Sequence, residues 1–437
     1  MVWSMKNALK QKAAPLVVGT VLAVLIAEAL LQVMFPRVEM DCPCFQPNPY
    51  FGGAYIPGAR GWAARFPEFA VPIQINSRGL RDSEFPYEKP AGTYRVLVLG
   101  DSFTAALNVP LQNTFHKVLM NRLNENGGAS KRRFEVISAG YNGFGTDLEL
   151  LFFRHEGFKY KPDLVVLAFF GNDLTDVSAS YKPYFTPADG FPYFALRDGK
   201  LDLRNFPGRI DARPGANATS EGQAGFADTV RRFLREKIRT VRLLWDFASQ
   251  VKSSLMGREE SGDSTGPLDK QPQYITHLAS YPPDMEDAQA LWKALALQLR
   301  DEVRAAGAEL VVMDIPWRES VEPRYWEALM RARPDAKAMS WDLDRPDNFV
   351  DTFLTQEGIP HLTLLPYLRA YARQGRELYY RGDGHLNVEG HRVTGELLFE
   401  WLAYRRLVPW ISRGSSPRPA LGRLNVNVAP GPRALSA

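Results

Sequence analysis

The sequence has little of what builds metal, disulfide and nucleic-acid sites. Only two of its 437 residues are cysteines, which excludes a disulfide framework and a cysteine-rich zinc site. None of its six histidines belongs to the H-E-x-x-H pattern of a zinc site. The formal net charge of +4 is small for this length, and the basic residues are spread out apart from the chain ends, so we expect no nucleic-acid partner. We predict a function that needs neither metal nor cofactor.

The N-terminal segment predicts a membrane anchor. Residues 1–12 form a short basic cytoplasmic end, and residues 13–35 are nearly all apolar. That length matches one bilayer crossing of a helix, and positive charge before the span places the rest of the chain outside the cytoplasm. A cleaved signal peptide ending near Ala27-Glu28-Ala29 is the alternative. We favour the uncleaved anchor because the apolar run continues past that site, and we expect a single-pass protein of the cytoplasmic membrane whose main domain is periplasmic or extracellular.

Residues 36–94 predict an extracytoplasmic lead-in. They are rich in proline, glycine and aromatic residues, and we expect one or two short strands packed on the domain that follows. Cys42 and Cys44 follow the span, and they form a strained local bridge, link two chains or stay as two inert thiols. Contacts to substrate are one interpretation of Arg78 and Arg81, and pairing at the surface is the default one.

Strands and helices alternate along residues 95–404. The near-continuously apolar strands are predicted at residues 95–99, 134–138, 163–170, 309–316 and 358–365. This alternation is typical of an α/β domain with a three-layer, doubly wound parallel sheet of the flavodoxin-like kind. Residues 177–285 break the rhythm with aromatic and proline-rich loops, which predict an inserted subdomain. Residues 405–437 are rich in proline, glycine and arginine, so we expect a disordered tail.

Four polar blocks fall at predicted strand ends of this sheet, and together they supply the groups that acyl transfer needs. They carry Ser102, Gly143, Asn172 and the pair Asp383 and His385. Open α/β sheets bind ligands at the carboxyl ends of their strands, so we expect these residues to meet. Ser102 would attack a carbonyl, His385 would take its proton, and Asp383 would hold the imidazole tautomer. The backbone N–H groups of Ser102 and Gly143, with the Asn172 side-chain amide, would form the oxyanion hole.

Each of these residues also has a purely structural interpretation. Ser102 alone reads as a helix cap, Asn172 as a turn residue and Asp383 as the cap of the next turn. The agreement of all four blocks favours the catalytic interpretation. His391 has no matching orienting group, and we interpret it as structural. The run 140–145 has the wrong glycine spacing for a dinucleotide fingerprint.

The four blocks resemble those of the SGNH hydrolases, the GDSL-type esterases and lipases, in a membrane-anchored bacterial member. Gly100-Asp101-Ser102 resembles the first block of that family, Gly143 the glycine of the second, Gly171-Asn172-Asp173 the third and Asp383-Gly384-His385 the fifth. The resemblance implies a serine hydrolase that works through an acyl-enzyme. One spacing departs from the common pattern, because many members have two residues between the aspartate and the histidine. The shorter spacing resembles the branch of alginate-acetylating and related polysaccharide-modifying proteins, and it leaves a backbone carbonyl as the alternative orienting group for His385.

The sequence therefore predicts a serine-dependent ester hydrolase that acts outside the cytoplasmic membrane on O-acetyl esters of glycans. Export, the aromatic-rich insertion and the short Asp–His spacing favour this substrate. The first alternative is an O-acyltransferase that modifies an exported polysaccharide, for which a membrane partner would supply the acyl donor. The second is a non-catalytic glycan-binding or assembly protein on the same fold. The expected partners are an acetylated carbohydrate and, through residues 13–35, the membrane.

Overall fold

The computed structural model describes residues 15, 18–30, 44–65, 68–126, 132–209, 240, 268 and 271–409. Within these residues, no helix has both the length and the apolar character that a membrane crossing requires. The predicted span at 13–35 is described only in part, with residues 18–30 helical. The predicted tail beyond residue 409 lies outside the described residues. The membrane anchor stays a prediction.

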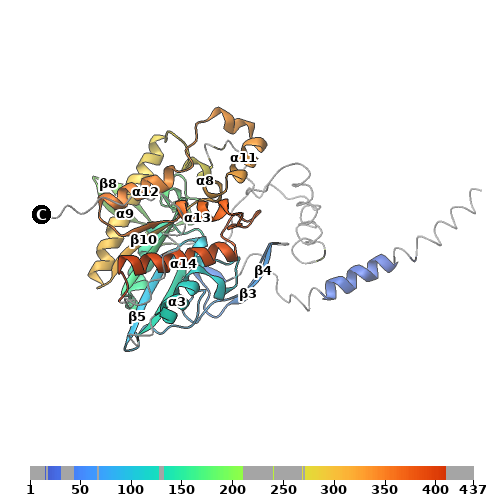
Figure 1. The fold of residues 1–437 in the computed structure, drawn as a ribbon, viewed down its shortest axis with the longest axis horizontal. Helices are drawn as coiled ribbons and strands as arrows, with labels where there is room; N and C mark the ends of the chain where they lie inside the picture. The colour runs from blue at the N-terminus through green and yellow to red at the C-terminus, as the bar shows by residue number, and fades with distance from the viewer. Residues whose placement is uncertain are drawn as a thin grey trace, which may run out of the picture.

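A five-stranded parallel sheet forms the centre of the domain (Figure 1). Its strands are β5 (Thr93–Gly100), β6 (Arg133–Gly140), β7 (Leu164–Phe170), β10 (Glu309–Ile315) and β11 (His361–Thr363). They lie in the order β11-β10-β7-β5-β6, and all neighbours are parallel. This is the flavodoxin-like order, in which the direction of winding reverses between the first and third strands of the sheet, here β5 and β7. The predicted α/β class with a doubly wound parallel sheet is confirmed.

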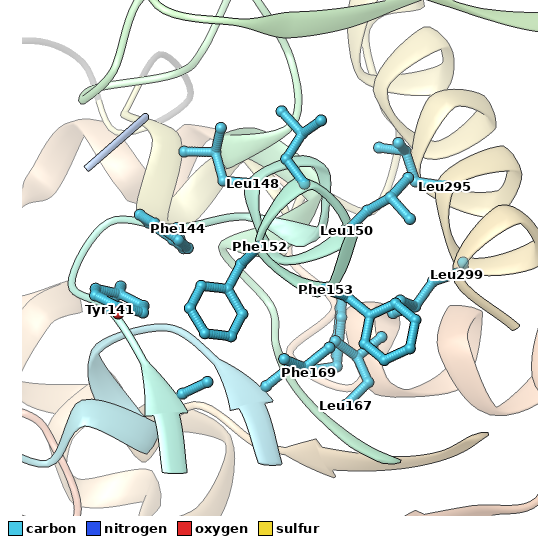
Figure 2. Packing of buried hydrophobic residues seen from close by; sticks show 14 of the residues in the cluster. Tyr141, Phe144, Leu148, Leu150, Phe152, Phe153, Leu167, Phe169, Leu295 and Leu299 are labelled. Carbon is cyan, nitrogen blue, oxygen red and sulfur yellow. The ribbon is translucent and has the colours of Figure 1, made fainter. Parts of the chain in front are cut away.

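Helices cover both faces of the sheet. One face carries α3 (Phe115–Asn126), α13 (Leu365–Arg373) and α14 (Val388–Arg405), and the other carries α4 (Thr146–His155), α9 (Pro283–Ala305) and α12 (Arg345–Gln356). In β5, Val96 and Val98 belong to the hydrophobic cluster on the α3 and α14 side, whereas Leu97 and Leu99 belong to the cluster on the α4 and α9 side. Figure 2 shows residues of the cluster on the α4 and α9 side, which we call the main hydrophobic cluster. Alternate side chains of one strand thus enter two cores, as a three-layer arrangement requires.

The edge strand β11 is shorter than the predicted strand at 358–365. It pairs only with β10, and Pro366 lies in the first turn of α13 directly after it. Proline at a helix start fixes the helical backbone there, so the extended segment ends early. The remaining elements are α2 (Ser102–Ala105), η1 (Leu111–Asn113), η3 (Gly157–Tyr160), α5 (Asp173–Asp176), η4 (Pro187–Asp189), β8 (Tyr193–Arg197), β9 (Lys200–Arg204), α8 (Pro272–Ile275), α10 (Arg318–Val321), α11 (Pro323–Ala332) and η6 (Pro334–Ala338).

The lead-in forms two β-hairpins rather than one or two short strands. β1 (Phe45–Asn48) pairs with β2 (Gly52–Tyr55), and β3 (Arg60–Arg65) pairs with β4 (Phe69–Gln74). Buried lead-in side chains such as Ile73 share one hydrophobic cluster with residues of the central sheet. The lead-in packs on the domain, as predicted. Cys44 is disulfide-bonded, and the only other cysteine, Cys42, lies outside the described residues.

Arg81 is buried, so the default interpretation of this residue as pairing at the surface is wrong. Its side chain is 3% exposed, and its guanidinium donates hydrogen bonds to the backbone carbonyls of Ala105, Ala106 and Val109. A buried cation is tolerated only where its donors are satisfied, and these carbonyls end the turn that follows β5. Arg81 therefore joins the lead-in to the segment that carries Ser102. Arg78 lies over the Tyr87 ring, 3.7 Å from its centroid.

Candidate active site

Ser102 opens the turn after β5, at the point where the strand order reverses. The turn is the single-turn helix α2, which Ala106 ends in a left-handed conformation with φ 51°. Asp101 caps it, because its Oδ1 accepts a hydrogen bond from the backbone N–H of Phe103 at 2.8 Å. A Cβ on Gly140 would lie 2.1 Å from the Ala105 nitrogen, so only glycine lets the end of β6 approach this turn. Four residues give little helix dipole, so any oxyanion stabilisation here comes from individual N–H groups.

Ser102, His385 and Asp383 form a continuous hydrogen-bonded chain. The Ser102 Oγ lies 2.8 Å from Nε2 of His385, and Nδ1 of His385 lies 2.9 Å from Oδ1 of Asp383. Both distances suit proton transfer by a general base. A carboxylate on Nδ1 fixes the proton there, which leaves Nε2 free to accept the serine proton. The structure thus brings the three predicted residues together, with a carboxylate rather than a backbone carbonyl orienting His385.

The electrostatic environment suits these roles. Burial alone would raise the pKa of Asp383, but the charge of His385, the hydrogen bond to it and the Arg65 guanidinium together bring that pKa below its usual value. Burial alone would lower the pKa of His385, but Asp383 raises it above the usual value through charge and hydrogen bonding. Asp383 is therefore a carboxylate at neutral pH, and the protonated form of His385 is stabilised.

A tight loop explains the short spacing between aspartate and histidine. Tyr379 and Leu386 pair across it as an isolated antiparallel bridge, and the His385 carbonyl accepts a hydrogen bond from the Tyr380 N–H at 2.9 Å. Gly384 takes a positive φ of 84° at its tip, a conformation that favours glycine. The reversal places the side chains of Asp383 and His385 together across one residue. We call residues 379–386 the catalytic loop.

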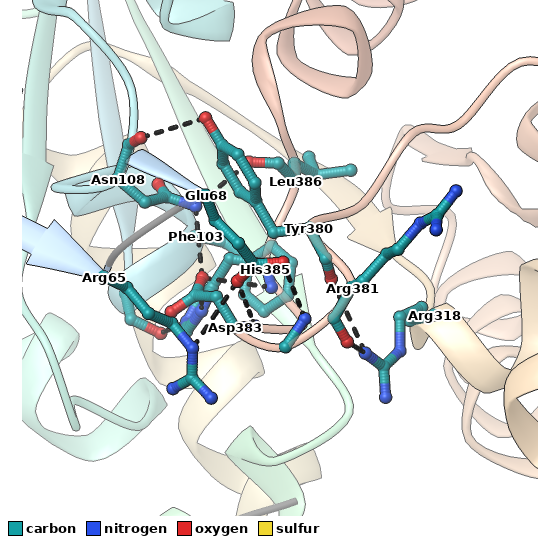
Figure 3. A network of polar contacts seen from close by, with 12 residues as sticks. Arg65, Glu68, Phe103, Asn108, Arg318, Tyr380, Arg381, Asp383, His385 and Leu386 are labelled. Atoms are coloured by element: carbon teal, nitrogen blue, oxygen red, sulfur yellow. Dashed lines mark hydrogen bonds and ion pairs between the residues drawn. The ribbon is translucent and has the colours of Figure 1, made fainter. Parts of the chain in front are cut away.

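Asn108 and Phe103 complete the surroundings of the loop, and the sequence motifs did not reveal them in this role (Figure 3). The Asn108 side-chain amide donates to Oδ1 of Asp383 at 3.3 Å and to the Leu386 carbonyl at 3.1 Å. The Phe103 ring lies 4.7 Å from the His385 ring, centroid to centroid. Both residues follow Ser102 closely in the chain, which is the one signal that favours them.

The predicted oxyanion residues lie at neighbouring strand ends. Gly143 follows β6 with a φ of 77°, and Asn172 follows β7. The Asn172 Nδ2 donates to Oδ2 of Asp176 at 3.0 Å, and its side chain also bonds Asp101. The structure therefore gives the Asn172 amide protein acceptors, and its role toward an oxyanion stays a prediction. His391 is buried and accepts from the Phe115 N–H at 3.3 Å, which agrees with its structural interpretation.

Two aromatic side chains cover the glycines at these strand ends. A Cβ on Gly143 would lie 2.9 Å from the Tyr184 ring, and one on Gly171 would lie 2.2 Å from Nε1 of Trp317. Tyr184 belongs to the insertion and is 54% exposed, whereas Trp317 follows β10. Within the part of the chain that the structure describes, no cluster of His, Cys, Asp and Glu side chains has the arrangement of a metal site.

No match was found among the curated proteins. Among solved structures, the acetyl xylan esterase AlAXEase is 11% identical over 69% of this chain and 96% of its own, with a TM-score of 0.36. Axe2, an acetylxylan esterase from Geobacillus stearothermophilus, is 11% identical over 74% and 97%, with a TM-score of 0.35. TesA is 14% identical over 71% and 98%, with a TM-score of 0.33.

The family comparison is more specific. Residues 274–408 match the model described as "SGNH hydrolase-like domain, acetyltransferase AlgX". The matched part includes β10, β11, α14 and the catalytic loop with Asp383 and His385, and Ser102 lies before it. The sequence blocks, the strand order and this match agree with one another, and residues 274–408 are similar to an SGNH hydrolase-like domain.

Proposed function

We propose that the protein is a serine esterase that forms an acyl-enzyme on Ser102. The observation that carries the proposal is the hydrogen-bonded chain from Ser102 Oγ to His385 Nε2 at 2.8 Å and from His385 Nδ1 to Asp383 at 2.9 Å. This arrangement provides a nucleophile, its base and the group that orients the base.

The reaction follows from this geometry in two steps. Ser102 Oγ attacks the ester carbonyl while His385 Nε2 takes its proton, and Asp383 stabilises the imidazolium that forms. His385 returns the proton to the leaving alcohol, the C–O bond of the ester breaks, and the acyl group remains on Ser102. A water molecule then repeats the attack with His385 as base, which releases the acid and restores the serine.

A reaction with a fluorophosphonate probe and hydrolysis of a small acetate ester test the proposal together. We expect the probe to label the protein at Ser102 and acetate to be released, and both to be lost in Ser102→Ala. Removing a nucleophile of this kind lowers turnover by about a million-fold. Absence of labelling in folded wild-type protein contradicts the esterase proposal and favours the non-catalytic alternative.

We further propose that the ester is an O-acetyl group on a glycan outside the cytoplasm. Tyr184 supports this substrate, because its half-exposed ring lies against Gly143, a predicted residue of the oxyanion hole. The next residue, Phe185, packs against Phe45, Phe144 and Phe191 at centroid distances of 5.6, 5.7 and 5.3 Å. The flat aromatic face and polar edge of Tyr184 suit the apolar face and hydroxyl rim of a sugar ring.

The substitution Tyr184→Ala separates glycan recognition from chemistry. We expect kcat/KM for an acetylated oligosaccharide to fall about tenfold, the equivalent of one aromatic contact, while hydrolysis of the small acetate ester stays within twofold of wild type. Tyr404→Ala is the matched control, since Tyr404 is 74% exposed on α14. Equal losses on both substrates, or none on either, contradict a sugar-stacking role.

An O-acyltransferase is the second candidate, and the match to the acetyltransferase AlgX family favours it. The acyl-enzyme would then pass its acyl group to a sugar hydroxyl instead of water. Incubation of the protein with an acetyl ester and an unacetylated oligosaccharide distinguishes the two. Acetylated sugar with little free acetate supports the transferase, and free acetate alone supports the hydrolase.

A further inference from the structure

We infer that Glu68, in the lead-in, is a positioning residue for the catalytic loop. Its Oε1 accepts a hydrogen bond from the Gly382 N–H at 2.7 Å, and its Oε2 accepts one from the Asp383 N–H at 3.0 Å. Figure 3 shows this carboxylate against the loop, beside the side chain of Asp383. The inference rests on the proposed function, because it assigns a role in the reaction to a residue that lies outside the catalytic motifs.

Two hydrogen bonds to successive N–H groups fix the orientation of the loop backbone as well as its distance from Glu68. One planar carboxylate that accepts from both Gly382 and Asp383 sets the orientation of the peptide between them, and hydrogen bonds to a charged acceptor are the stronger kind. The Glu68 side chain is 15% exposed, so water competes little for these bonds. The orientation of that peptide sets where the Asp383 side chain begins.

The hairpin that carries Glu68 is itself firmly held. β3 and β4 pair in register from Arg60 opposite Gln74 to Arg65 opposite Phe69. Val71 and Ile73 in β4 are buried in the main hydrophobic cluster. The Phe69 ring, next to Glu68, lies 5.1 Å from the ring of Tyr380 in the catalytic loop. Glu68 lies in the turn directly before β4, and its N–H donates to the Arg65 carbonyl at 2.7 Å, so paired strands carry the group that positions the loop.

Arg65 links the same hairpin to the charge of the site. Its Nε lies 3.5 Å from Oε2 of Glu68, and its guanidinium is among the groups that hold the pKa of Asp383 below the usual value. One cation thus lies near both carboxylates, which offsets their mutual repulsion. Without it, the Glu68 carboxylate would oppose the ionised form of Asp383.

Side chains from distant parts of the chain hold the loop at several points. Asn108 holds the Asp383 side chain and the Leu386 carbonyl from one direction, and Arg318 donates to the Arg381 carbonyl from another. Glu68 holds the two N–H groups between these points. A shift of about 1 Å in a catalytic group lowers turnover by up to about 100-fold.

The experiment compares Glu68→Ala and Glu68→Gln with wild type in the full chain. It measures the rate of Ser102 labelling by a fluorophosphonate, and kcat and KM for a small acetate ester. We expect Glu68→Ala to lower kcat and the labelling rate together by about 10- to 100-fold, with KM within twofold. Glu68→Gln keeps one carbonyl acceptor, and we expect it to recover part of the loss.

Glu84→Ala is the matched control. Glu84 also accepts two hydrogen bonds within the lead-in, from the N–H and Oγ of Ser77 at 2.8 and 2.6 Å, and no catalytic residue is among these partners. Wild-type kcat in Glu68→Ala, or a loss no larger than in Glu84→Ala, overturns the inference. Should Glu68→Ala fail to fold, Glu68→Gln decides: a lower kcat at unchanged KM supports the role, and wild-type kcat overturns it. A wild-type protein that the probe does not label overturns the proposed function instead.

Discussion

At the scale of single residues, the site depends on the coupling between Asp383 and His385. The carboxylate raises the pKa of His385 above its usual value, because the loop brings the two side chains within 2.9 Å. Nε2 can accept the serine proton only while the imidazole is neutral. Activity should therefore be lost as pH falls through a midpoint above the ordinary histidine value of about 6.5.

The first prediction concerns Asp383→Asn. We expect kcat to fall by about 10⁴-fold, as when an amide replaces the carboxylate of a serine-hydrolase triad and selects the wrong tautomer. The acidic midpoint of the remaining activity should lie at a lower pH than in wild type, because the charge that raises the His385 pKa is gone. Profiles of kcat/KM from pH 5 to pH 9 measure both effects. An unchanged midpoint would show that another group orients His385.

The sequence identified the residues of the site that lie inside local motifs and missed those held by long-range contacts. Ser102 and His385 stand in short blocks with a chemical signature, so their pairing could be predicted across the sheet. Glu68 and Asn108 stand in no motif. Glu68 meets Asp383 across 315 residues, and only the path of the β3–β4 hairpin brings them together. Arg81 was misjudged for the same reason, since its carbonyl partners are backbone atoms.

At the scale of elements, a buried ion pair holds the insertion against α4. Lys182 Nζ lies 2.7 Å from Oδ2 of Asp147 and donates to the Asp176 carbonyl at 2.6 Å, and both side chains of the pair are almost fully buried. Lys182 lies two residues before Tyr184. This contact therefore sets where the start of the insertion lies over the site.

The second prediction is that Lys182→Met destabilises the protein by about 3–5 kcal/mol, because it leaves the Asp147 charge buried without a partner. Urea unfolding measures this. Arg331→Met is the control: Arg331 pairs with Glu327 at 4.0 Å with both side chains exposed, and such pairs contribute about 0–1 kcal/mol. Similar small effects in both variants would show that Asp147 is neutral in the native protein.

A second polar contact lies between β10 and α12. Asp314 and Asp347 are both buried, and each carboxyl group is disfavoured in its charged form by the burial. Burial raises the pKa of Asp314 well above its usual value and that of Asp347 to about 7. Carboxyl groups with raised native pKa values stabilise the fold most in acid, and that stability is lost as pH rises above about 3.9, the unfolded value.

The third prediction follows from this loss of stability with rising pH. Asp314→Asn removes a buried carboxyl group with a raised pKa, so we expect it to stabilise the protein at pH 8 by at least about 1.4 kcal/mol, the free energy of one pKa unit. At pH 4.5 we expect little difference. Thermal unfolding at the two pH values measures the change. A variant less stable than wild type at both values would contradict a raised pKa of Asp314 in the native protein.

At the scale of the whole molecule, the lead-in and the α/β domain form one core. Besides the shared hydrophobic cluster, Asp82 of the lead-in pairs with Lys117 of α3 and accepts the Ser138 N–H of β6 at 2.8 Å. Both charged side chains are fully buried. The composition of residues 36–94 predicted a lead-in with short strands that packs on the domain. It did not reveal that the buried partners of this segment lie in α3 and β6.

The fourth prediction is therefore a single cooperative unfolding transition for the lead-in and the domain. Tryptophan fluorescence, which includes Trp62 in β3, and loss of Ser102 labelling should coincide in urea. Asp82→Asn should lower the free energy of unfolding by about 3–5 kcal/mol, since Lys117 loses its charged partner. An earlier fluorescence transition, with labelling retained, would show that the lead-in unfolds independently.

The closing of the triad across 283 residues has a consequence for the newly made chain. Asp383 and His385 are neighbours in a short loop, but Ser102 precedes them by most of the polypeptide. At about 5–20 residues per second, synthesis of that interval takes about 15–60 s. Throughout this time the serine exists without its base, and a chain that stops short of the loop never gains one. Ser102 can therefore be activated as a nucleophile only after the catalytic loop has been synthesised.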